Sequence, residues 1–382
     1  MTPRPKRLAV VGGGVAGLVT AWLLEPVRDV VLYERNSFLG GHAHTIEGGF
    51  DLAAQFVSPT AQPTYWRLAH DILGMKMHRV VGTAALHQPP AVMFDSVRPY
   101  RAPLGAAGLA ATLLAGRIDC SWDMTVAEFM SRRLAWLPTS VRANVILPWI
   151  AAWGNCVIPL ALETSAKAAL AWMIRAAKPL PMPYYNADEG LGAIASRLTI
   201  PNTRVSSEVT QISRSPEGFH IGEDVFDELV LAVPVSVARK LIAGVLDRGL
   251  SGFTEIRATT AIHTDPRYMP PRRQDWRAFN AVRCGEYCEA SIWYGGLRKS
   301  GEQMFKSWTT FRSQQPSEVI ATAEYLHPVM TPETIRAQRR LAAVQGSDGL
   351  WFAGSWTYDL DSQESAVVSA LRISERLGGR TF

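Results

Sequence analysis

The sequence predicts an α/β fold that begins with a βαβ unit and returns to the same parallel sheet after two excursions into a second domain. Two observations support this fold class. Residues 8–34 follow the order strand, glycine-rich turn, helix, strand, acid, which is the order of a Rossmann-type βαβ unit. Strand and helix patterns recur at 203–234 and 349–372, after long segments of different composition. We therefore expect a Rossmann-like domain and a discontinuous α+β domain.

The glycine-rich turn has the spacing that dinucleotide binding requires. Gly12, Gly14 and Gly17 form a Gly-x-Gly-x-x-Gly pattern directly after an apolar run. Gly12 permits the tight turn, Gly14 lets the backbone approach a pyrophosphate, and Gly17 lets the helix pack closely on the sheet. The first helical residues, Val15 and Ala16, then offer unpaired N–H groups to the phosphates.

An acidic residue ends the second strand of this unit. Glu34 lies 22 residues after Gly12, where a carboxylate can accept hydrogen bonds from the hydroxyls of an adenosine ribose. An acid at this place disfavours a 2′-phosphate, and therefore NADP. The alternative is a plain structural turn, but the strand before the glycines and the helix after them favour a dinucleotide site.

The loop after Glu34 indicates which dinucleotide binds. Arg35 follows the acid, and the pair Gly40–Gly41 comes six residues beyond it, before His42. This arrangement resembles the second phosphate-contacting loop of the flavin-containing amine oxidase superfamily, which includes monoamine and polyamine oxidases, L-amino-acid oxidases, phytoene desaturases and protoporphyrinogen oxidase. The family usually has a basic residue after the glycines, where this chain has His42. From the residues alone a tight loop would also fit; the resemblance favours FAD over NAD.

Composition and charge exclude some classes of protein. The chain has 382 residues, long enough for two domains, and is 47% hydrophobic and 19% charged, as in ordinary globular proteins. The net charge is +5, but lysine and arginine are scattered along the chain, which disfavours nucleic-acid binding. A modestly basic surface leaves open anionic substrates and a peripheral contact with a membrane.

The four cysteines have no spacing typical of a metal site, and we expect no bound metal. Free thiols are usual in a reducing compartment. The apolar run near the N-terminus is the first expected strand and is too short for a signal peptide. No run of eighteen uncharged apolar residues exists, so no transmembrane helix is expected. These features together predict a cytoplasmic protein.

A long helical region rich in alanine, leucine and tryptophan is expected from Leu104 to Arg175. Aromatic side chains on helices usually belong to a core, but an insertion into a dinucleotide-binding domain usually builds the substrate cavity. An apolar lining would imply an apolar or amphipathic small-molecule substrate. The proline-rich segment 178–183 is expected to connect the domains.

Two later segments resemble parts of the FAD domain of the superfamily. Residues 188–198 resemble the helix that re-enters this domain, and 203–212 alternates as a strand. In the resemblance the backbone of Val209 meets the adenine end of the cofactor. Residues 226–234 resemble the strand that runs under the cofactor and ends at a proline, and 235–248 is expected to be a helix.

The C-terminal segment resembles the flavin-contacting signature of the superfamily. A strand ends in Phe-Ala-Gly at Gly354, and a helix begins near Gln363 with the pattern Glu-x-Ala at Ala366. The resemblance implies that the start of this helix faces the flavin, with a backbone N–H near Gln363 at the flavin O2. A helix N-terminus stabilises negative charge there. The usual acid after Phe-Ala-Gly is Ser355, which changes one contact to the cofactor.

The resemblance also implies some differences from the family. No cysteine lies between Cys288 and the C-terminus, so the FAD should be non-covalent. Ser362 stands where amine oxidases often have an aromatic residue beside the flavin. This difference weakens the expectation of an aromatic cage around a substrate amine. Many members have a lysine water-bridged to the flavin N5; Lys306 is the candidate here, with a surface lysine as the alternative. His327 is a candidate proton acceptor, with a structural histidine as the alternative.

The sequence therefore predicts an FAD-binding Rossmann-like (GR2-type) domain from residues 1–75, 184–235 and 342–382, and a substrate domain from 76–183 and 236–341. The expected activity is that of a flavoprotein oxidoreductase that takes a hydride from a largely apolar substrate to the flavin N5, with O2 as one candidate electron acceptor. Oxidation of an amine is one form of this reaction. A desaturase or double-bond isomerase of a fatty-acyl or isoprenoid substrate is the alternative.

Overall fold

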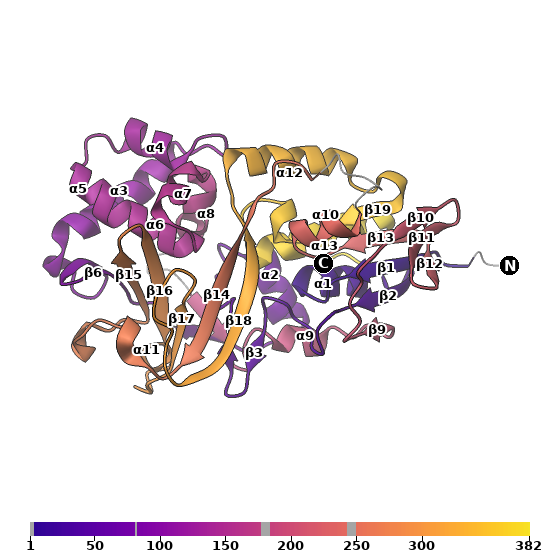
Figure 1. Ribbon diagram of the computed structural model, residues 1–382, viewed down its shortest axis with the longest axis horizontal. Helices are drawn as coiled ribbons and strands as arrows, with labels where there is room; N and C mark the ends of the chain where they lie inside the picture. Colours follow the sequence, from indigo (N-terminus) through magenta and orange to yellow (C-terminus); the bar gives the residue numbers. More distant parts are fainter. Residues whose placement is uncertain (1–3, 81, 177–183, 243–249) are drawn as a thin grey trace.

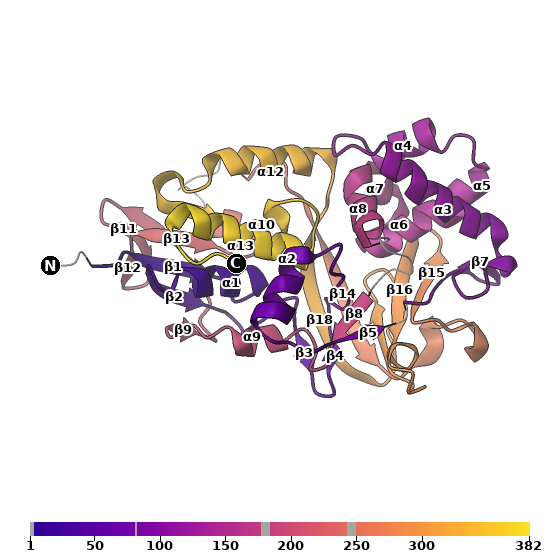
Figure 2. The same ribbon diagram turned by 180° about the vertical axis from the view of Figure 1, so that it is seen from behind.

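A computed structural model describes residues 4–80, 82–176, 184–242 and 250–382. Figure 1 shows an elongated molecule, with a parallel sheet at one end, a group of helices at the other, and a second sheet between them. Figure 2 shows the same arrangement from behind, where α1, α13 and α2 lie together beside the parallel sheet. The proline-rich connector 178–183 and most of the second half of the helix expected at 235–248 lie outside the described residues.

The parallel sheet assembles strands from distant parts of the chain. Its order is β19-β13-β1-β2-β9, and every neighbouring pair is parallel. The central strand β1 lies between β13 and β2, so that Leu8 is paired with Glu228 on one side and with Val30 on the other. The strands are β1 (Arg7–Val11), β2 (Asp29–Tyr33), β9 (Thr203–Arg204), β13 (Glu228–Leu231) and β19 (Leu350–Phe352).

Helices cover both faces of this sheet, because successive strand residues point to opposite sides. Leu8 and Val10 pack in one apolar cluster with α1 (Val15–Leu24) and α13 (Gln363–Leu377). Ala9 and Val11 pack in another cluster with α10 (Val235–Leu241) and α12 (Pro332–Val344). Strands buried on both faces are continuous apolar runs, which is why this part of the sequence is easy to recognise.

The second sheet has the order β18-β14-β17-β16-β15-β6-β7. Its neighbours are antiparallel except β15 and β6, which are parallel. The strands are β6 (Ala84–Gln88), β7 (Ala91–Asp95), β14 (Glu255–His263), β15 (Phe279–Cys284), β16 (Tyr287–Trp293), β17 (Phe305–Trp308) and β18 (Val319–Pro328).

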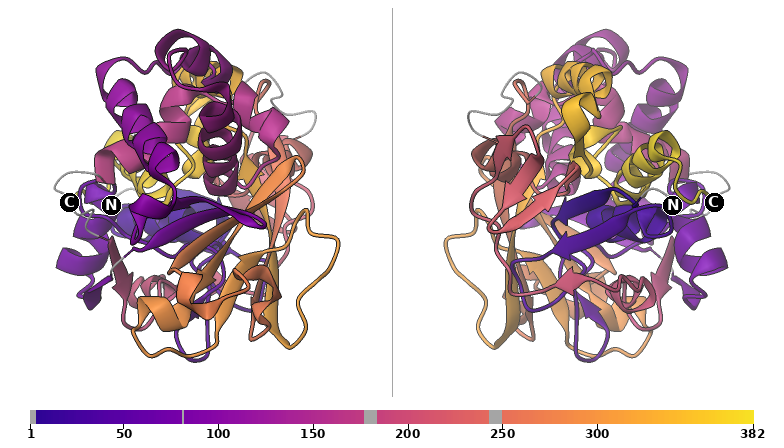
Figure 3. Two further views of the ribbon diagram at one scale, coloured as in Figure 1. Left: turned by 90° about the vertical axis from the view of Figure 1, so that its left-hand side faces the viewer. Right: turned by 90° about the vertical axis from the view of Figure 1, so that its right-hand side faces the viewer.

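The helical region expected at 104–175 is confirmed, as a group of short helices stacked against this second sheet (Figure 3). Its α-helices are α3 (Pro103–Ile118), α4 (Val126–Arg133), α5 (Thr139–Val141), α6 (Leu147–Gly154), α7 (Ile158–Glu163) and α8 (Ala166–Ala176). The remaining elements are shorter: β3 (Thr45–Ile46), β4 (Phe50–Asp51), α2 (Pro63–Trp66), β5 (Met77–Val80), β8 (Tyr184–Ala187), α9 (Ala193–Arg197), β10 (Ser213–Ser215), β11 (Gly218–Ile221), β12 (Asp224–Phe226) and α11 (Tyr294–Leu297).

One expected strand is much shorter in the structure. The sequence pattern predicts a strand over 203–212, but β9 ends at Arg204. Ser206 has a left-handed backbone with φ of 51°, and its N–H donates to the carbonyl oxygen of Asn36 at 2.8 Å. Ser207 N–H donates to the carbonyl oxygen of Glu34, also at 2.8 Å. The chain leaves the sheet edge because its backbone binds the loop after β2. The strand predicted from the alternation over 203–212 was therefore wrong beyond Arg204.

Candidate cofactor and substrate site

The first glycine turn lies at the carboxyl edge of the parallel sheet and has no room for side chains. Gly12 has φ of 109°, and a Cβ atom on it would lie 2.4 Å from the carbonyl oxygen of Ala232. A Cβ on Gly17 would lie 1.9 Å from the carbonyl oxygen of Gly12. Both approaches are backbone contacts that cannot relax by a rotamer change. Ligands of such open parallel sheets bind at this edge.

The second glycine loop packs directly on the first. Gly40 N–H donates to the carbonyl oxygen of Gly13 at 2.8 Å, and a Cβ on Gly41 would lie 3.0 Å from the Cα of Gly14. Gly40 and Gly41 both have positive φ. The two loops therefore bring exposed backbone to one place, where a pyrophosphate could approach closely.

Glu34 holds this pair of loops together from the end of β2. Its Oε2 accepts the N–H of Gly13 at 2.7 Å and its Oε1 accepts the N–H of Asn36 at 2.8 Å. The side chain is buried. A carboxylate has about four acceptor positions, so two remain for ribose hydroxyls. Arg35 is exposed, and Val209 is half-buried, two residues after the Ser207 contact to Glu34.

A cluster of ionisable and aromatic side chains lies behind the second glycine loop. The ring of His42 is 4.5 Å from that of Tyr325 and 5.1 Å from that of His327, centroid to centroid. His327 Nδ1 is 2.8 Å from Asp361 Oδ2, and Asp361 Oδ1 accepts the hydroxyl of Ser355. Asp361 thus connects the Ser355 hydroxyl to the His327 ring.

The pKa values fix the proton positions in this cluster. Burial and the neighbouring His327 lower the pKa of His42 to about 4, so His42 is neutral. Burial opposes ionisation of Asp361, but its hydrogen bonds with His327 and Ser355 lower its pKa overall. An ionised carboxylate only accepts hydrogen bonds, so His327 Nδ1 donates to it. When His327 is neutral, its Nε2 therefore carries the free lone pair.

Helix α13 begins two residues after Asp361, beside this cluster. Ser362 caps it by accepting the N–H of Ser365 at 3.2 Å, and Gly354 precedes it with φ of 146°. Glu364 accepts the N–H groups of Thr64 and Tyr65, at 3.1 and 2.8 Å, and so fixes α2 beside α13. Ser362, in the place of the usual aromatic residue, thus has a structural task as a cap.

Several buried polar atoms here have no hydrogen-bond partner among the described residues. They are Tyr65 Oη, Tyr325 Oη, His327 Nε2 and Gln363 Nε2. Leaving such groups unsatisfied costs free energy, so they indicate where a polar ligand belongs. Together with the glycine cradle, these atoms fit a dinucleotide: Gly12, Gly14, Gly17 and Gly41 would admit its phosphates, and Gln363 and Ala366 lie at the start of α13, at the other end of the site.

Lys306 is buried on β17, so the surface alternative is wrong. Its Nζ donates to the carbonyl oxygen of Ala53 at 2.9 Å. Burial lowers the pKa of this lysine, against the opposing charge of Asp51. Burial likewise raises the pKa of Asp51, which accepts hydrogen bonds from the Thr45 hydroxyl at 2.5 Å and the Leu191 N–H at 2.8 Å. A buried acid, Asp51, thus begins the segment 51–56, and a buried base, Lys306, binds the backbone of this segment at Ala53.

A polar cavity of about 290 Å³ reaches Asp51 from outside. Asp51 and Gln55 line it together with Tyr294 and Arg298. The Tyr294 hydroxyl contacts both Gln55 Oε1 at 2.7 Å and the carbonyl oxygen of Asp51 at 3.0 Å. Water in this cavity would connect the buried acid to solvent.

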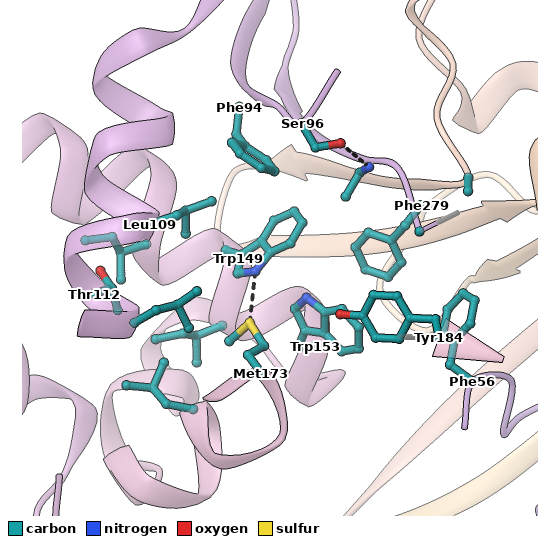
Figure 4. Close-up of a pocket in the computed structure, with 17 residues that line it drawn as sticks. Phe56, Phe94, Ser96, Leu109, Thr112, Trp149, Trp153, Met173, Tyr184 and Phe279 are labelled. Atoms are coloured by element: carbon teal, nitrogen blue, oxygen red, sulfur yellow. Dashed lines mark hydrogen bonds between the residues drawn. The ribbon is translucent and has the colours of Figure 1, made fainter. Parts of the chain in front are cut away.

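An apolar cavity of about 150 Å³ lies at the other end of segment 51–56. Figure 4 shows the rings of Trp149, Trp153, Phe279 and Tyr184 around it, with Phe56 at the end nearest that segment. No lining residue is charged. The full lining is Phe56, Gly82, Ala84, Phe94, Ser96, Leu109, Thr112, Leu113, Ile146, Trp149, Ile150, Trp153, Leu170, Met173, Tyr184, Ala278 and Phe279.

The few polar groups of this lining are mostly turned away from the space. Thr112 Oγ1 donates to the carbonyl oxygen of Gly108 at 2.7 Å, and Ser96 Oγ accepts the N–H of Ala84 at 2.8 Å. Trp149 Nε1 donates to Met173 Sδ at 3.4 Å. Trp153 Nε1 is buried without a hydrogen-bond partner among the described residues. It is therefore a donor available to a bound molecule.

The structure brings the predicted residues of both chain ends together and adds some that the sequence argument missed. Tyr325 and Asp361 lie beside His327, and Asp51 beside the carbonyl that Lys306 binds. The spacing of Tyr325 and His327 was a usable signal, since residues two apart on a strand share a face. Asp361 had no such signal, because its partner is distant in sequence.

No group of three or more histidine, cysteine, aspartate or glutamate side chains within the described ranges is placed to hold a metal ion. The four cysteines are free. No described helix is long and apolar enough to cross a bilayer.

Comparison with known proteins supports this description of the fold. Residues 10–72 match the NAD(P)-binding Rossmann-like domain family. No curated protein sequence matches the chain. Among solved structures, a CLA-producing fatty acid isomerase from P. acnes has a TM-score of 0.68 and 14% sequence identity, over 97% of this chain and 98% of that chain.

Two further structures are similar over their whole length. Cyclohexylamine oxidase from Brevibacterium oxydans IH-35A has a TM-score of 0.66 and 14% identity, over 98% of this chain and 100% of that chain. Reduced UDP-galactopyranose mutase has a TM-score of 0.67 and 13% identity, over 98% of this chain and 94% of that chain. The predicted α/β fold class is confirmed: the chain shares the fold of these three structures, with a Rossmann-like segment at residues 10–72.

Proposed function

We propose that this protein is an oxidoreductase that binds FAD non-covalently and oxidises a small, largely apolar substrate. One observation carries the proposal. Two glycine loops pack on each other, and the second leads into the cluster of His42, His327 and Asp361 at the start of α13, where buried polar atoms lack a partner among the described residues. Such an arrangement is costly unless a polar ligand fills it.

The cofactor would supply hydride acceptance at the flavin N5. The chain supplies the rest. The unpaired N–H groups at the start of α13 would stabilise negative charge at the end of the flavin ring. The apolar lining from Phe56 to Phe279 would exclude water from the reacting carbon.

Two side chains are proposed to handle protons. Lys306 has a lowered pKa because it is buried, so it exchanges a proton near neutral pH more readily than a surface lysine. His327 has its Nδ1 proton held by Asp361, which leaves Nε2 as an acceptor. Lys306 stands behind the carbonyl of Ala53, close to Asp51 and the polar cavity, so its proton can reach solvent by that route.

The substrate is proposed to be uncharged where it enters the apolar cavity. No charged side chain lines it, and burying an unpaired ammonium or carboxylate there would be strongly unfavourable. An amine would therefore enter as the neutral base, with its carbon–nitrogen bond toward the flavin and O2 as the candidate acceptor for reoxidation. The four free cysteines are consistent with work in the cytoplasm, which we include in this proposal.

A second candidate function is favoured by the same lining. Trp153 offers a donor in a cavity whose described lining is mostly aromatic and aliphatic, which suits a fatty-acyl or isoprenoid chain. On such a chain the reaction would be desaturation, or double-bond isomerisation if the hydride returns to another carbon.

The test is anaerobic titration of the purified protein, first with apolar amines and then with unsaturated fatty acids. Loss of the flavin absorption band with an amine would support an amine oxidase. Bleaching only with acyl or isoprenoid substrates, or turnover without net bleaching, would support the second candidate. A protein with bound flavin that no compound of either class reduces or converts would contradict both.

A further inference from the structure

Helix α3 is apolar on two opposite sides. Its inner side contributes Leu109 and Leu113 to the lining of the apolar cavity. Its outer side exposes Leu104, Leu114 and Ile118, whose relative exposures are 65%, 59% and 79%. These three positions lie on one face of the 16-residue helix, because at 3.6 residues per turn they fall within an arc of about 80°. A helix that only closed a cavity would have a polar outer face.

Exposed aromatic side chains lie at both ends of this outer face. Tyr100, 76% exposed, precedes α3 in the short helical turn Pro99–Arg101. Trp136, 72% exposed, follows α4, and the ion pair between Arg133 and Asp119 ties the end of α4 to the end of α3. We call Tyr100, Leu104, Leu114, Ile118 and Trp136 the α3 patch. Figure 3, left, looks onto this end of the molecule.

The charge around the α3 patch is positive. Residues 97–142 contain six arginines and three acidic residues, and α3 itself has no acidic residue. Arg132 and Arg133 are 62% and 47% exposed in their side chains, in surface ion pairs with Glu128 and Asp119. Such pairs are worth little in water, so these arginines can also serve an external anion. Arg98 and Arg101 are bound to Asp275.

We propose that the α3 patch docks this protein on the surface of an anionic lipid bilayer. An apolar helix face flanked by aromatic residues and arginines is the pattern of a helix lying in the membrane interface. The arginines would contact lipid phosphates, and the leucine and isoleucine side chains would enter the acyl region. The protein would lie on the bilayer without spanning it, since no described helix is long and apolar enough to cross.

A second copy of this chain fits the patch less well than a bilayer. A two-fold interface brings the same surface of both copies together, so the net positive segment 97–142 would face the same segment of the other copy. Anionic lipid instead supplies the opposite charge. Charge complementarity therefore selects the bilayer.

Docking at this place has a consequence for the cavity. The same helix forms the cavity wall on its inner side and the patch on its outer side, and a helix with its side chains is only about 10 Å across. An apolar molecule dissolved in the bilayer would thus be close to the cavity. This consequence rests on the proposed function; the docking itself does not.

The test is flotation of the full-length protein with vesicles of phosphatidylcholine alone and of phosphatidylcholine with an equal part of phosphatidylglycerol. We expect binding to the anionic vesicles that falls steeply with salt. The triple variant L114Q/I118Q/W136Q should bind about tenfold or more weakly, because three apolar side chains no longer enter the acyl region. The matched control, V205Q/V319Q/I320Q, changes three exposed apolar residues elsewhere and should bind as the wild type.

A second variant tests the charge. R132Q/R133Q should lose most of the preference for anionic vesicles while keeping weak binding to neutral ones. All of these positions are exposed, and circular dichroism with thermal unfolding should show unchanged folds. Wild type that does not float with anionic vesicles, or a patch variant that floats as well as the wild type, would overturn the proposal. Concentration-dependent dimers that the patch variant abolishes would show a second copy as the occupant instead. Flavin content is measured separately, so failure of docking and failure of FAD binding are distinguishable.

Discussion

The two ends of the candidate site are built in different ways. At the nucleotide end the decisive features are backbone positions without side chains, at Gly12, Gly17 and Gly41, within one short stretch of the chain. At the substrate end the decisive features are large side chains brought from several separate segments, as in the contact of Phe56 with Tyr184. The nucleotide end therefore tolerates almost no substitution, whereas the substrate end can change its shape with one side chain. This difference explains how one fold serves many substrates.

The largest expected effect comes from Gly17→Ala at the nucleotide end. The new Cβ would lie 1.9 Å from the carbonyl oxygen of Gly12, so the turn must shift. We expect loss of bound flavin and destabilisation of about 3 kcal/mol. The measurement is flavin content and thermal unfolding of the purified variant.

Gly154→Ala is the matched control, because a Cβ there meets only the Cys156 sulfur at 3.4 Å. Normal flavin binding by Gly17→Ala would show that the nucleotide end is not rigid, and the comparison between the two ends would fail.

Lys306→Met should have the next largest effect, and it changes a residue that belongs to neither end of the site. The variant keeps the apolar stem of the side chain but removes its proton and its hydrogen bond to Ala53. We expect turnover to fall about a hundredfold, in the range of a lost proton-transfer group, while flavin content stays normal. Steady-state kinetics with the substrate found by anaerobic titration would measure this. Unchanged turnover at every pH would make Lys306 purely structural.

Leu109→Phe should have a smaller effect, confined to the substrate end. The larger side chain reduces the apolar cavity from the α3 side. We expect KM to rise about tenfold, as for a mismatch of a few carbons in an apolar pocket, with an unchanged flavin spectrum. Leu114→Phe, on the exposed side of the same helix, is the control. Equal KM values for both variants would place the substrate elsewhere.

The smallest expected effect is a pH dependence of stability at Lys306. Its pKa is lower in the folded protein than in the unfolded chain, so between these two values the folded protein binds fewer protons. The free energy of unfolding of the wild type therefore rises with pH in that window. Lys306→Met lacks this term. The stability of the variant minus that of the wild type should fall between about pH 7.5 and about pH 9.5, by up to about 1.4 kcal/mol per pH unit.

Urea unfolding of both proteins across this range measures the difference. The window lies above the range in which Asp51 titrates, so its raised pKa contributes little. A difference that is constant with pH would mean that Lys306 is not desolvated in the folded protein.

The glycine turn and the C-terminal helix could be predicted from the sequence, whereas the burial and contacts of other site residues could not, for physical reasons. Glycine spacing and apolar runs are local signals, so the turn at Gly12–Gly17 and the helix α13 could be placed. The burial of Lys306 could not be predicted, because it depends on the contact of this side chain with the carbonyl of Ala53, which is distant in sequence. Asp361 likewise acquires its role only through contact with His327. The domain boundaries and the roles of the individual site residues stay predictions.

The central claim is that the glycine loops and α13 enclose a non-covalently bound FAD. Its most direct test is the absorption spectrum of the purified protein, followed by mild acid denaturation and identification of the released flavin. We expect flavin absorption, with one FAD per chain released into solution. A colourless protein that takes up no FAD on reconstitution, but binds NAD, would contradict it.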